Sequence, residues 1–292
     1  MKEQSFAFGD EGGLVGTICL PSIEQSARAQ IGLVLFNAGV VHRIGPHRLN
    51  VRLARRLAAR GIPSIRFDLT GQGDSARSHV TRSFEEQAVE DLRAAMGLLC
   101  SVAKVPQFAL FGFCSGGVNS YAAAKVDERV AGLMMFDTYI YPTFWSIANR
   151  YVVKIRSRGL ITSTTGWVGR RLRWLTDSLP TIFRPSAAPA ALGQAVLFVT
   201  PAKTEFANTL TTLDKRGVKI GMVYSRGFEQ YNYRNQFADA FRRFGINAFV
   251  KSEFLSDMDH TATLMAQQEV FMQVIERWSV EVNESRRSTK KN

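Results

Sequence analysis

Several features that would narrow the function of this chain are missing from its sequence. Its three cysteines, Cys19, Cys100 and Cys114, show neither metal-site nor disulfide spacing, so reduced thiols are expected. No phosphate-binding loop, nicotinamide-binding fingerprint or cluster of metal ligands is recognisable, and no cofactor is expected. No stretch approaches the run of about 18 apolar residues that a membrane span needs, and no apolar leader follows Met1. The sequence therefore predicts a cytoplasmic protein without a membrane span.

Acidic residues are fewer than basic ones: 25 Asp and Glu stand against 37 Lys and Arg, a formal net charge of +12. Such an excess can bind a nucleic-acid backbone. The cations are spread, however, over the segment 47–60, the region around Arg170 and the C-terminal SRRSTKKN, without zinc-finger spacing or an aromatic RNA-binding pattern. We interpret them as solvated faces and expect no nucleic-acid partner, whereas an anionic or carrier-bound substrate is compatible with the charge.

The hydrophobic pattern alternates between strands and helices along most of the 292 residues. Residues 6–8 and 14–19 predict an opening antiparallel hairpin. Further strands are predicted at 31–36, 62–68, 108–112, 130–136, 218–224 and 246–254, and helices at 47–60, 83–100, after Cys114, at 232–244 and at 262–280. This order predicts an α/β fold with a mostly parallel central sheet and helices on both faces.

The alternation stops between residues 138 and 191. This segment mixes aromatic residues with arginines at helical spacing and shows no clear strand. It predicts an inserted helical cap, whose aromatic residues chiefly pack within the cap itself and could also wall a pocket. We therefore predict a core of residues 1–137 and 192–282, interrupted by the cap at 138–191 and followed by a frayed basic tail at 283–292.

The stretch GFCSGG begins at Gly112, where an apolar strand stops and a helix begins. Cys114 would lie at the apex of a tight turn, and Gly112 and Gly116 would let the strand and the helix pack closely. The amide of Ser115 would point along the start of the helix, where the dipole lowers a thiol pKa and stabilises an oxyanion. Cys114 is therefore a candidate nucleophile, and a buried structural cysteine beside a helix start is the alternative.

GFCSGG resembles the nucleophile elbow of the α/β-hydrolase superfamily, with cysteine where serine is usual. FDLTGQGDS at 67–75 resembles the turn after the fourth strand of that family, FNAG at 36–39 stands in the place of its oxyanion loop, and DMDH at 257–260 in that of its histidine loop. Residues 37–75 are also similar to bacterial hydrolases found with exosortase systems. The elbow is similar to those of polyhydroxyalkanoate synthases and dienelactone hydrolases, which use a cysteine.

The resemblance implies that His260 is the catalytic histidine, because it follows the last core strand. For the acid, the family pattern points to the stretch 225–229, in which Glu229 is our first choice. Asp137, at the end of the strand after the elbow, is the rival. A Cys-His dyad without an acid is also feasible, because a thiol ionises more readily than a hydroxyl.

The oxyanion hole is expected to use two backbone amides. One belongs to Ser115, and the second comes from the loop after the strand 31–36, with Gly39 our choice and Ala38 or Val40 close behind. Asn37 replaces the usual histidine of that loop, where it either closes the loop by a hydrogen bond or contacts substrate.

These residues together imply a hydrolase that cleaves an ester or thioester of a small-molecule acyl substrate through an acyl-cysteine intermediate. Two alternatives remain open. An acyltransferase would pass the acyl group to an alcohol or amine, and a degenerate hydrolase fold would serve only as a binding module.

Overall fold

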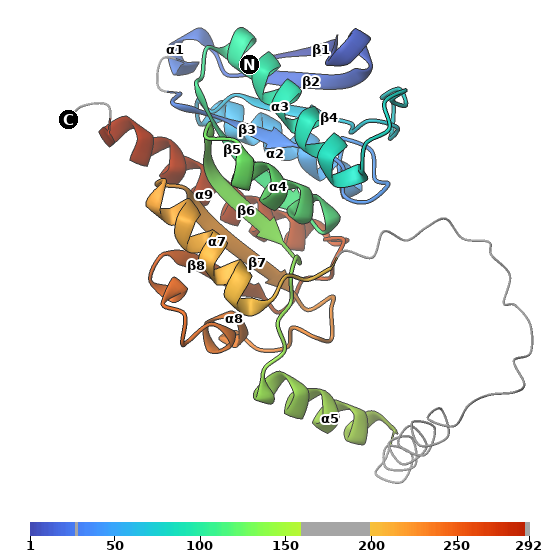
Figure 1. Cartoon of the computed structure of the whole chain (residues 1–292), viewed down its shortest axis with the longest axis vertical. Helices are drawn as coiled ribbons and strands as arrows, with labels where there is room; N and C mark the ends of the chain where they lie inside the picture. The colour runs from blue at the N-terminus through green and yellow to red at the C-terminus, as the bar shows by residue number, and fades with distance from the viewer. Residues whose placement is uncertain (27–28, 159–198, 290–292) are drawn as a thin grey trace, which may run out of the picture.

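The computed structural model describes residues 1–26, 29–158 and 199–289 (Figure 1). Within them lies one eight-stranded sheet in the order β1-β2-β4-β3-β5-β6-β7-β8. The strands are β1 (Lys2–Phe8), β2 (Leu14–Leu20), β3 (Ile31–Leu35), β4 (Ser64–Phe67), β5 (Gln107–Phe113), β6 (Val130–Phe136), β7 (Lys219–Ser225) and β8 (Val250–Leu255). Strand β2 pairs antiparallel with β1 and β4, and all other neighbours are parallel. The predicted α/β fold with a mostly parallel sheet is confirmed.

The helices lie on both faces of this sheet (Figure 1). They are α1 (Ile23–Ser26), α2 (Leu49–Ala59), α3 (Phe84–Ala103), α4 (Ser115–Val126), α5 (Phe144–Arg158), α7 (Lys203–Lys215), α8 (Gln236–Ala240) and α9 (Met265–Thr289). Helix α3 begins at a capping box, in which the backbone amide of Glu86 donates to Ser83 Oγ and the Glu86 carboxylate accepts from the Ser83 amide. This signal in the sequence explains why the start of α3 was predicted correctly.

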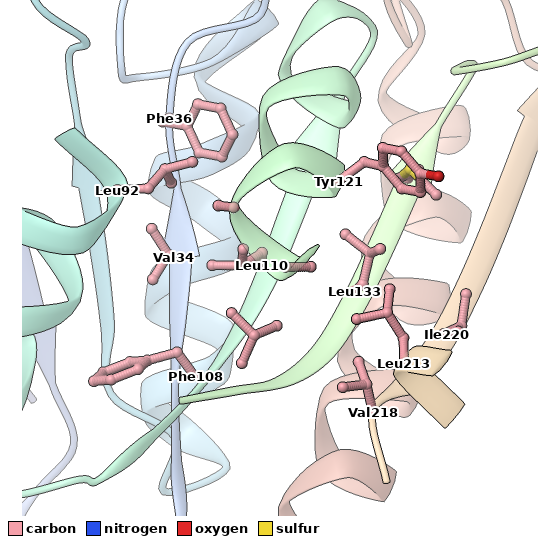
Figure 2. Packing of buried hydrophobic residues seen from close by; sticks show 14 of the residues in the cluster. Val34, Phe36, Leu92, Phe108, Leu110, Tyr121, Leu133, Leu213, Val218 and Ile220 are labelled. Carbon is pink, nitrogen blue, oxygen red and sulfur yellow. The ribbon is translucent and has the colours of Figure 1, made fainter. Parts of the chain in front are cut away.

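Two apolar layers form because successive strand residues point to opposite faces. On β3, Leu33 and Leu35 pack against α2 and α9, whereas Val34 packs on the side of α3, α4 and α7. Figure 2 shows part of the layer on the side of α3, α4 and α7, which contains Val34 and Leu110 from the strands and Leu92 from α3. Strands β3, β5 and β6 are thus buried on both faces, which accounts for their continuous apolar runs in the sequence.

The C-terminal third differs from the prediction in four places. The strand expected at 246–254 begins only with β8, after a short 3-10 helix at Ile246–Ala248. Helix α7 was not predicted, and the helix expected at 232–244 is reduced to the short α8. Helix α9 continues through Thr289, so the expectation of a frayed tail from residue 283 is wrong for residues 283–289. The reason is tertiary: Asn283 Oδ1 accepts hydrogen bonds from the backbone amides of Gln30, at 2.7 Å, and Ile31, at 3.3 Å. These contacts hold the basic segment against the start of β3.

The predicted cap lies only partly among the described residues. Its first part contains the helix α5, in agreement with the helical spacing, and residues 159–191 lie outside the described residues. The start of α5 is tied to the loop before α8, because Asn232 Nδ2 donates to Ser146 O at 2.9 Å and the hydroxyls of Thr143 and Tyr233 lie 2.7 Å apart. Whether the segment is a separate cap domain remains a prediction.

None of the helices in the described ranges is both long enough and apolar enough to cross a membrane.

Strand β5 and helix α4 approach each other so closely that only glycine fits between them. A Cβ built on Gly112 would lie 2.4 Å from both Gly116 O and Gly117 Cα. The expectation that Gly112 permits this packing is confirmed. Gly117 was not foreseen, although its Cβ would lie 2.0 Å from Thr138 Oγ1. The close approach is what places residue 114 at the point of the turn.

Gly112→Ala is expected to destabilise the protein by about 3 kcal/mol or more, because the new Cβ would meet backbone atoms that cannot move without separating α4 from β5. Gly97→Ala in α3 is the matched control: no atom lies within 4 Å of its Cβ position. Since alanine is the better helix former, this control should stabilise by about 0.5–1 kcal/mol. Chemical denaturation followed by circular dichroism measures both. A Gly112→Ala protein as stable as the wild type would contradict this packing.

Candidate active site

The candidate residues meet at one edge of the sheet. Strands β3, β5, β6, β7 and β8 run parallel, so their carboxyl ends lie together. Cys114 directly follows β5, Asp137 directly follows β6, and Ser225 ends β7. The loops after β3 and β8 bring Gly39 and His260 to the same edge. Residues far apart in the sequence, such as Asp137 and His260, thereby become neighbours.

Cys114 has a backbone conformation that a residue with a side chain seldom adopts, with φ 53° and ψ −118°. Three contacts hold it there. Its amide donates to Phe136 O at 2.8 Å, and its carbonyl accepts from the Gly117 amide at 3.0 Å and from Thr138 Oγ1 at 2.8 Å. The side chain is half-buried at the start of α4. A strained residue held by its surroundings at the end of a strand is typical of a functional position.

His260 is paired with Asp137 and not with Glu229. Its Nδ1 lies 2.8 Å from Asp137 Oδ2, and the Asp137 side chain is fully buried. Glu229 is exposed, on the loop after β7. The choice of Glu229 as the residue that reaches the imidazole is therefore wrong, and Asp137, its rival in the sequence, takes the place. The loop after β7 presents Phe228 to His260, with the ring centroids 4.6 Å apart.

The protonated form of His260 is favoured by its two polar neighbours. Burial alone would lower the pKa of the imidazole, but hydrogen bonds and charge interactions with Asp137 and Cys114 raise it to about 9. Since Nδ1 faces Asp137, Nε2 is the nitrogen left for the thiol. The imidazole of His260 thus interacts with the carboxylate of Asp137 and with the side chain of Cys114.

Aromatic rings enclose the imidazole. Phe136 is stacked on it with an interplanar angle of 13°, and Phe113 and Phe228 approach it edge-on or tilted, with centroids 5.4 Å and 4.6 Å away. These rings limit the access of water and fix the plane of the imidazole. The imidazole is thus partly shielded, with 27% of the His260 side chain exposed.

The two expected oxyanion residues are in contact, although through an atom that the sequence did not suggest. The Gly39 amide donates a hydrogen bond to Ser115 Oγ at 2.7 Å. The Ser115 amide belongs to the first turn of α4, whose leading N–H groups have no partner within the helix. Gly39 has φ 56°, a conformation that favours glycine. The Ser115 hydroxyl therefore occupies a donor that was expected to face substrate.

The loop that carries Gly39 is anchored by a buried polar network. Asn37 Oδ1 accepts from the Leu69 amide at 2.6 Å, and Asn37 Nδ2 donates to Asp68 Oδ1 at 2.9 Å and to Val41 O at 2.8 Å. Of its two expected roles, Asn37 takes that of closing the loop. The family-like turn contributes the partner, because the fully buried Asp68 also accepts from the Arg43 amide at 2.7 Å.

A group of possible metal ligands lies in the same network. His42, Asp68 and Asp74 bring one ligand atom each to within 4.8 Å of one another. The guanidinium of Arg43 forms ion pairs with both Asp68 and Asp74, so a cation already compensates these carboxylates. These residues do not fit a metal site.

Ser225 also belongs to this region, although no motif in the sequence marks it. It donates to both carboxylate oxygens of Asp137, from its amide at 2.7 Å and from its hydroxyl at 2.5 Å. The signal was its position: Ser225 opens the stretch in which the acid was expected. A serine at this position cannot be recognised as functional until its contact with Asp137 is known.

Comparisons with known proteins identify the family and the fold. The family described as serine aminopeptidase, S33, matches residues 32–177, half of the chain. The chain belongs to this family. The match to the S33 family includes Cys114 and Asp137 and ends before His260. The S33 assignment makes the chain an α/β hydrolase, as the sequence resemblance implied. No curated protein matches the chain.

Solved structures share the fold of this S33 member. An esterase of Pyrococcus furiosus matches with a TM-score of 0.53 and 12% identity over 95% of this chain and 88% of its own. An esterase domain from Rhodothermus marinus matches with a TM-score of 0.53 and 18% identity, and a serine hydrolase homologue from Coxiella burnetii with 0.53 and 17%, both over 95% of this chain and 97% of theirs. At such identities the likeness concerns the fold alone.

Asp137→Asn is expected to lower the pKa of His260 by about one unit or more, because it removes the charge of the carboxylate that contacts Nδ1. Glu229→Gln removes the same charge from an exposed position and should leave this pKa unchanged. The imidazole resonances of His260, followed by NMR as a function of pH, measure both. The assignment of the partner would be wrong if Glu229→Gln produced the larger shift.

Proposed function

We propose that this chain hydrolyses esters or thioesters through an acyl-enzyme on Cys114. One observation carries the proposal: the Nδ1 atom of His260 lies 2.8 Å from the buried carboxylate of Asp137. Burial opposes protonation of this imidazole, and hydrogen bonds with Asp137 and then with Cys114 raise its pKa. A nucleophile, a base and an orienting acid are the groups that covalent acyl transfer needs. The family supports the hydrolase part of the proposal, and the thiol chemistry is our inference.

In the first half-reaction, the thiolate of Cys114 attacks the carbonyl carbon of the substrate. The negative charge that develops on the carbonyl oxygen is stabilised by the amides of Ser115 and Gly39. The imidazolium of His260 then gives its Nε2 proton to the leaving alcohol or thiol, the bond to the leaving group breaks, and a thioester to Cys114 remains. Asp137 accepts a hydrogen bond from Nδ1–H and thereby keeps Nε2 directed toward the sulfur.

In the second half-reaction, His260 is neutral and accepts a proton from water through Nε2. The hydroxide attacks the thioester carbonyl, the carbon–sulfur bond breaks, and the acid leaves. Thiolate and imidazolium are thereby restored. A raised pKa of His260 assists the first half-reaction, since the imidazole then carries the proton that the leaving group needs.

Acyl transfer to an alcohol or amine is the second candidate. The same acyl-enzyme would form, and the acceptor would replace water in the step that His260 catalyses. The phenyl rings of Phe113, Phe136 and Phe228 limit the access of water to the imidazole. This environment favours an alcohol or amine over water as the acceptor. Mass spectrometry of the products with and without an added alcohol or amine separates the two reactions.

A non-catalytic binding module is less well supported. The sequence suggested it because the acid was uncertain, and Asp137 lies against His260. We further propose a cytoplasmic enzyme that acts on a small acyl substrate, related to the hydrolases of exosortase systems through residues 37–75.

Cys114→Ala is expected to abolish both ester cleavage and the acyl adduct, because it removes the attacking sulfur. The wild type should form the adduct on the peptide that contains Cys114 when it is incubated with a panel of aryl esters and acyl thioesters and analysed by mass spectrometry. Cys100→Ala, at the other half-buried cysteine, is the control and should retain full activity. Cleavage that survives in Cys114→Ala would refute a cysteine nucleophile.

Ser115→Ala is expected to raise kcat/KM by about two- to tenfold, the worth of one net hydrogen bond. The substrate carbonyl must displace the Ser115 hydroxyl from the Gly39 amide, and the variant has no hydroxyl to displace. Ser115→Thr keeps the hydroxyl and should stay near the wild type. Steady-state kinetics on a cleaved ester give the comparison. A lower kcat in Ser115→Ala would show that the hydroxyl assists the reaction, contrary to this expectation.

A further inference from the structure

The Asp137 carboxylate is held at both oxygens by one residue. Oδ1 accepts from the Ser225 amide at 2.7 Å, and Oδ2 accepts from Ser225 Oγ at 2.5 Å. Oδ2 is also the oxygen that contacts His260 Nδ1, at 2.8 Å. Asp137 and Ser225 are both buried, with exposed fractions of 6% and 0%. The orientation of the carboxylate toward the imidazole is therefore set by Ser225.

The sheet explains why these two residues meet. Strands β6 and β7 are parallel neighbours, with Phe136 opposite Val223, and the Asp137 amide donates to Val223 O at 2.9 Å. The residue after β6 and the last residue of β7 consequently face each other at the carboxyl edge. Asp137 also has φ 49°, an unfavourable conformation for a residue with a side chain, so its position depends on such contacts.

The residues that follow Ser225 hold the other side of the imidazole. The Gly227 amide donates to Ser225 Oγ at 3.0 Å, so this hydroxyl is fixed as a donor toward Asp137. A Cβ on Gly227 would lie 2.5 Å from the His260 backbone nitrogen, and the ring of Phe228 is 4.6 Å from the imidazole. The Arg226 amide donates to Met258 O at 3.1 Å and ties this segment to the loop that carries His260.

We infer that Ser225 is a positioning residue for the reaction, which acts on His260 through Asp137. The inference rests on the proposed function. With both oxygens held, the carboxylate presents Oδ2 to Nδ1 and keeps the imidazole directed at Cys114. Without the hydroxyl, only Oδ1 is held, and the carboxylate can rotate away from Nδ1. The segment 225–228, in which the acid was expected, thus serves the acid of the neighbouring strand.

Ser225→Ala is expected to lower kcat about tenfold with little change in KM, because the substrate does not contact Ser225 while the proton transfer depends on the imidazole. It should also lower the pKa of His260 by about half to one unit, as the contact with Asp137 weakens. Ser225→Thr retains the hydroxyl and should recover most of the activity. Steady-state kinetics and the NMR titration of His260 give these quantities, with circular dichroism showing that each variant is folded.

Ser64→Ala is the matched control. Ser64 is likewise a fully buried strand serine, but it lies at the start of β4, and its hydroxyl has no partner among the described residues. This variant should match the wild type in both measurements. An unchanged or raised pKa of His260 in a folded Ser225→Ala protein would overturn the inference. The titration needs no substrate, so it decides the role of Ser225 even if no ester in the panel is cleaved. The proposed function is tested separately, by whether Cys114→Ala abolishes ester cleavage.

Discussion

The site depends on the contact between a buried carboxylate and a histidine that would otherwise lose its charge. His260 lies among three phenyl rings, where burial opposes protonation, and Asp137 reverses that preference. A buried ion pair is stable only when each partner has its remaining hydrogen bonds satisfied. Ser225 satisfies those of Asp137, and the thiol of Cys114 interacts with the other side of the imidazole. Charge, orientation and nucleophile are therefore one coupled unit.

Two residues of the site, Cys114 and Asp137, also have strained backbone conformations. Cys114 and Asp137 both have positive φ, and each is the first residue after a parallel strand. Hydrogen bonds between adjacent strand ends hold them, since the Cys114 amide donates to Phe136 O and the Asp137 amide to Val223 O. The sheet thus orders three consecutive strand ends by the same type of contact, which a loop on its own could not maintain.

Most of the fold could be predicted from the sequence because it depends on local patterns. The apolar runs of β3, β5 and β6 and the capping box of α3 identify their elements without reference to the rest of the chain. Helix α8 and the end of α9 were predicted poorly, because their extent is set by tertiary contacts such as that of Asn283 with the start of β3.

The residues of the site also differ in how far the sequence alone could predict them. Cys114, Ser115, Gly39 and His260 could be proposed from short motifs whose order matches a known pattern. The acid could not be decided, because an aspartate after β6 and a glutamate after β7 end at the same edge of the sheet. Only the pairing of β6 with β7 shows that position 225 faces Asp137.

The ordered end of α9 has a practical meaning for anyone who trims this protein. The last ten residues, 283–292, look dispensable from their composition, because the segment is short and basic. Shortening the chain to residue 282 would nevertheless take away the amide oxygen that accepts from the backbone of residues 30 and 31, and also Arg286, which donates to Gly217 O at 2.6 Å ahead of β7. Strands β3 and β7 would each lose an anchor at the amino end, at the opposite edge of the sheet from Cys114.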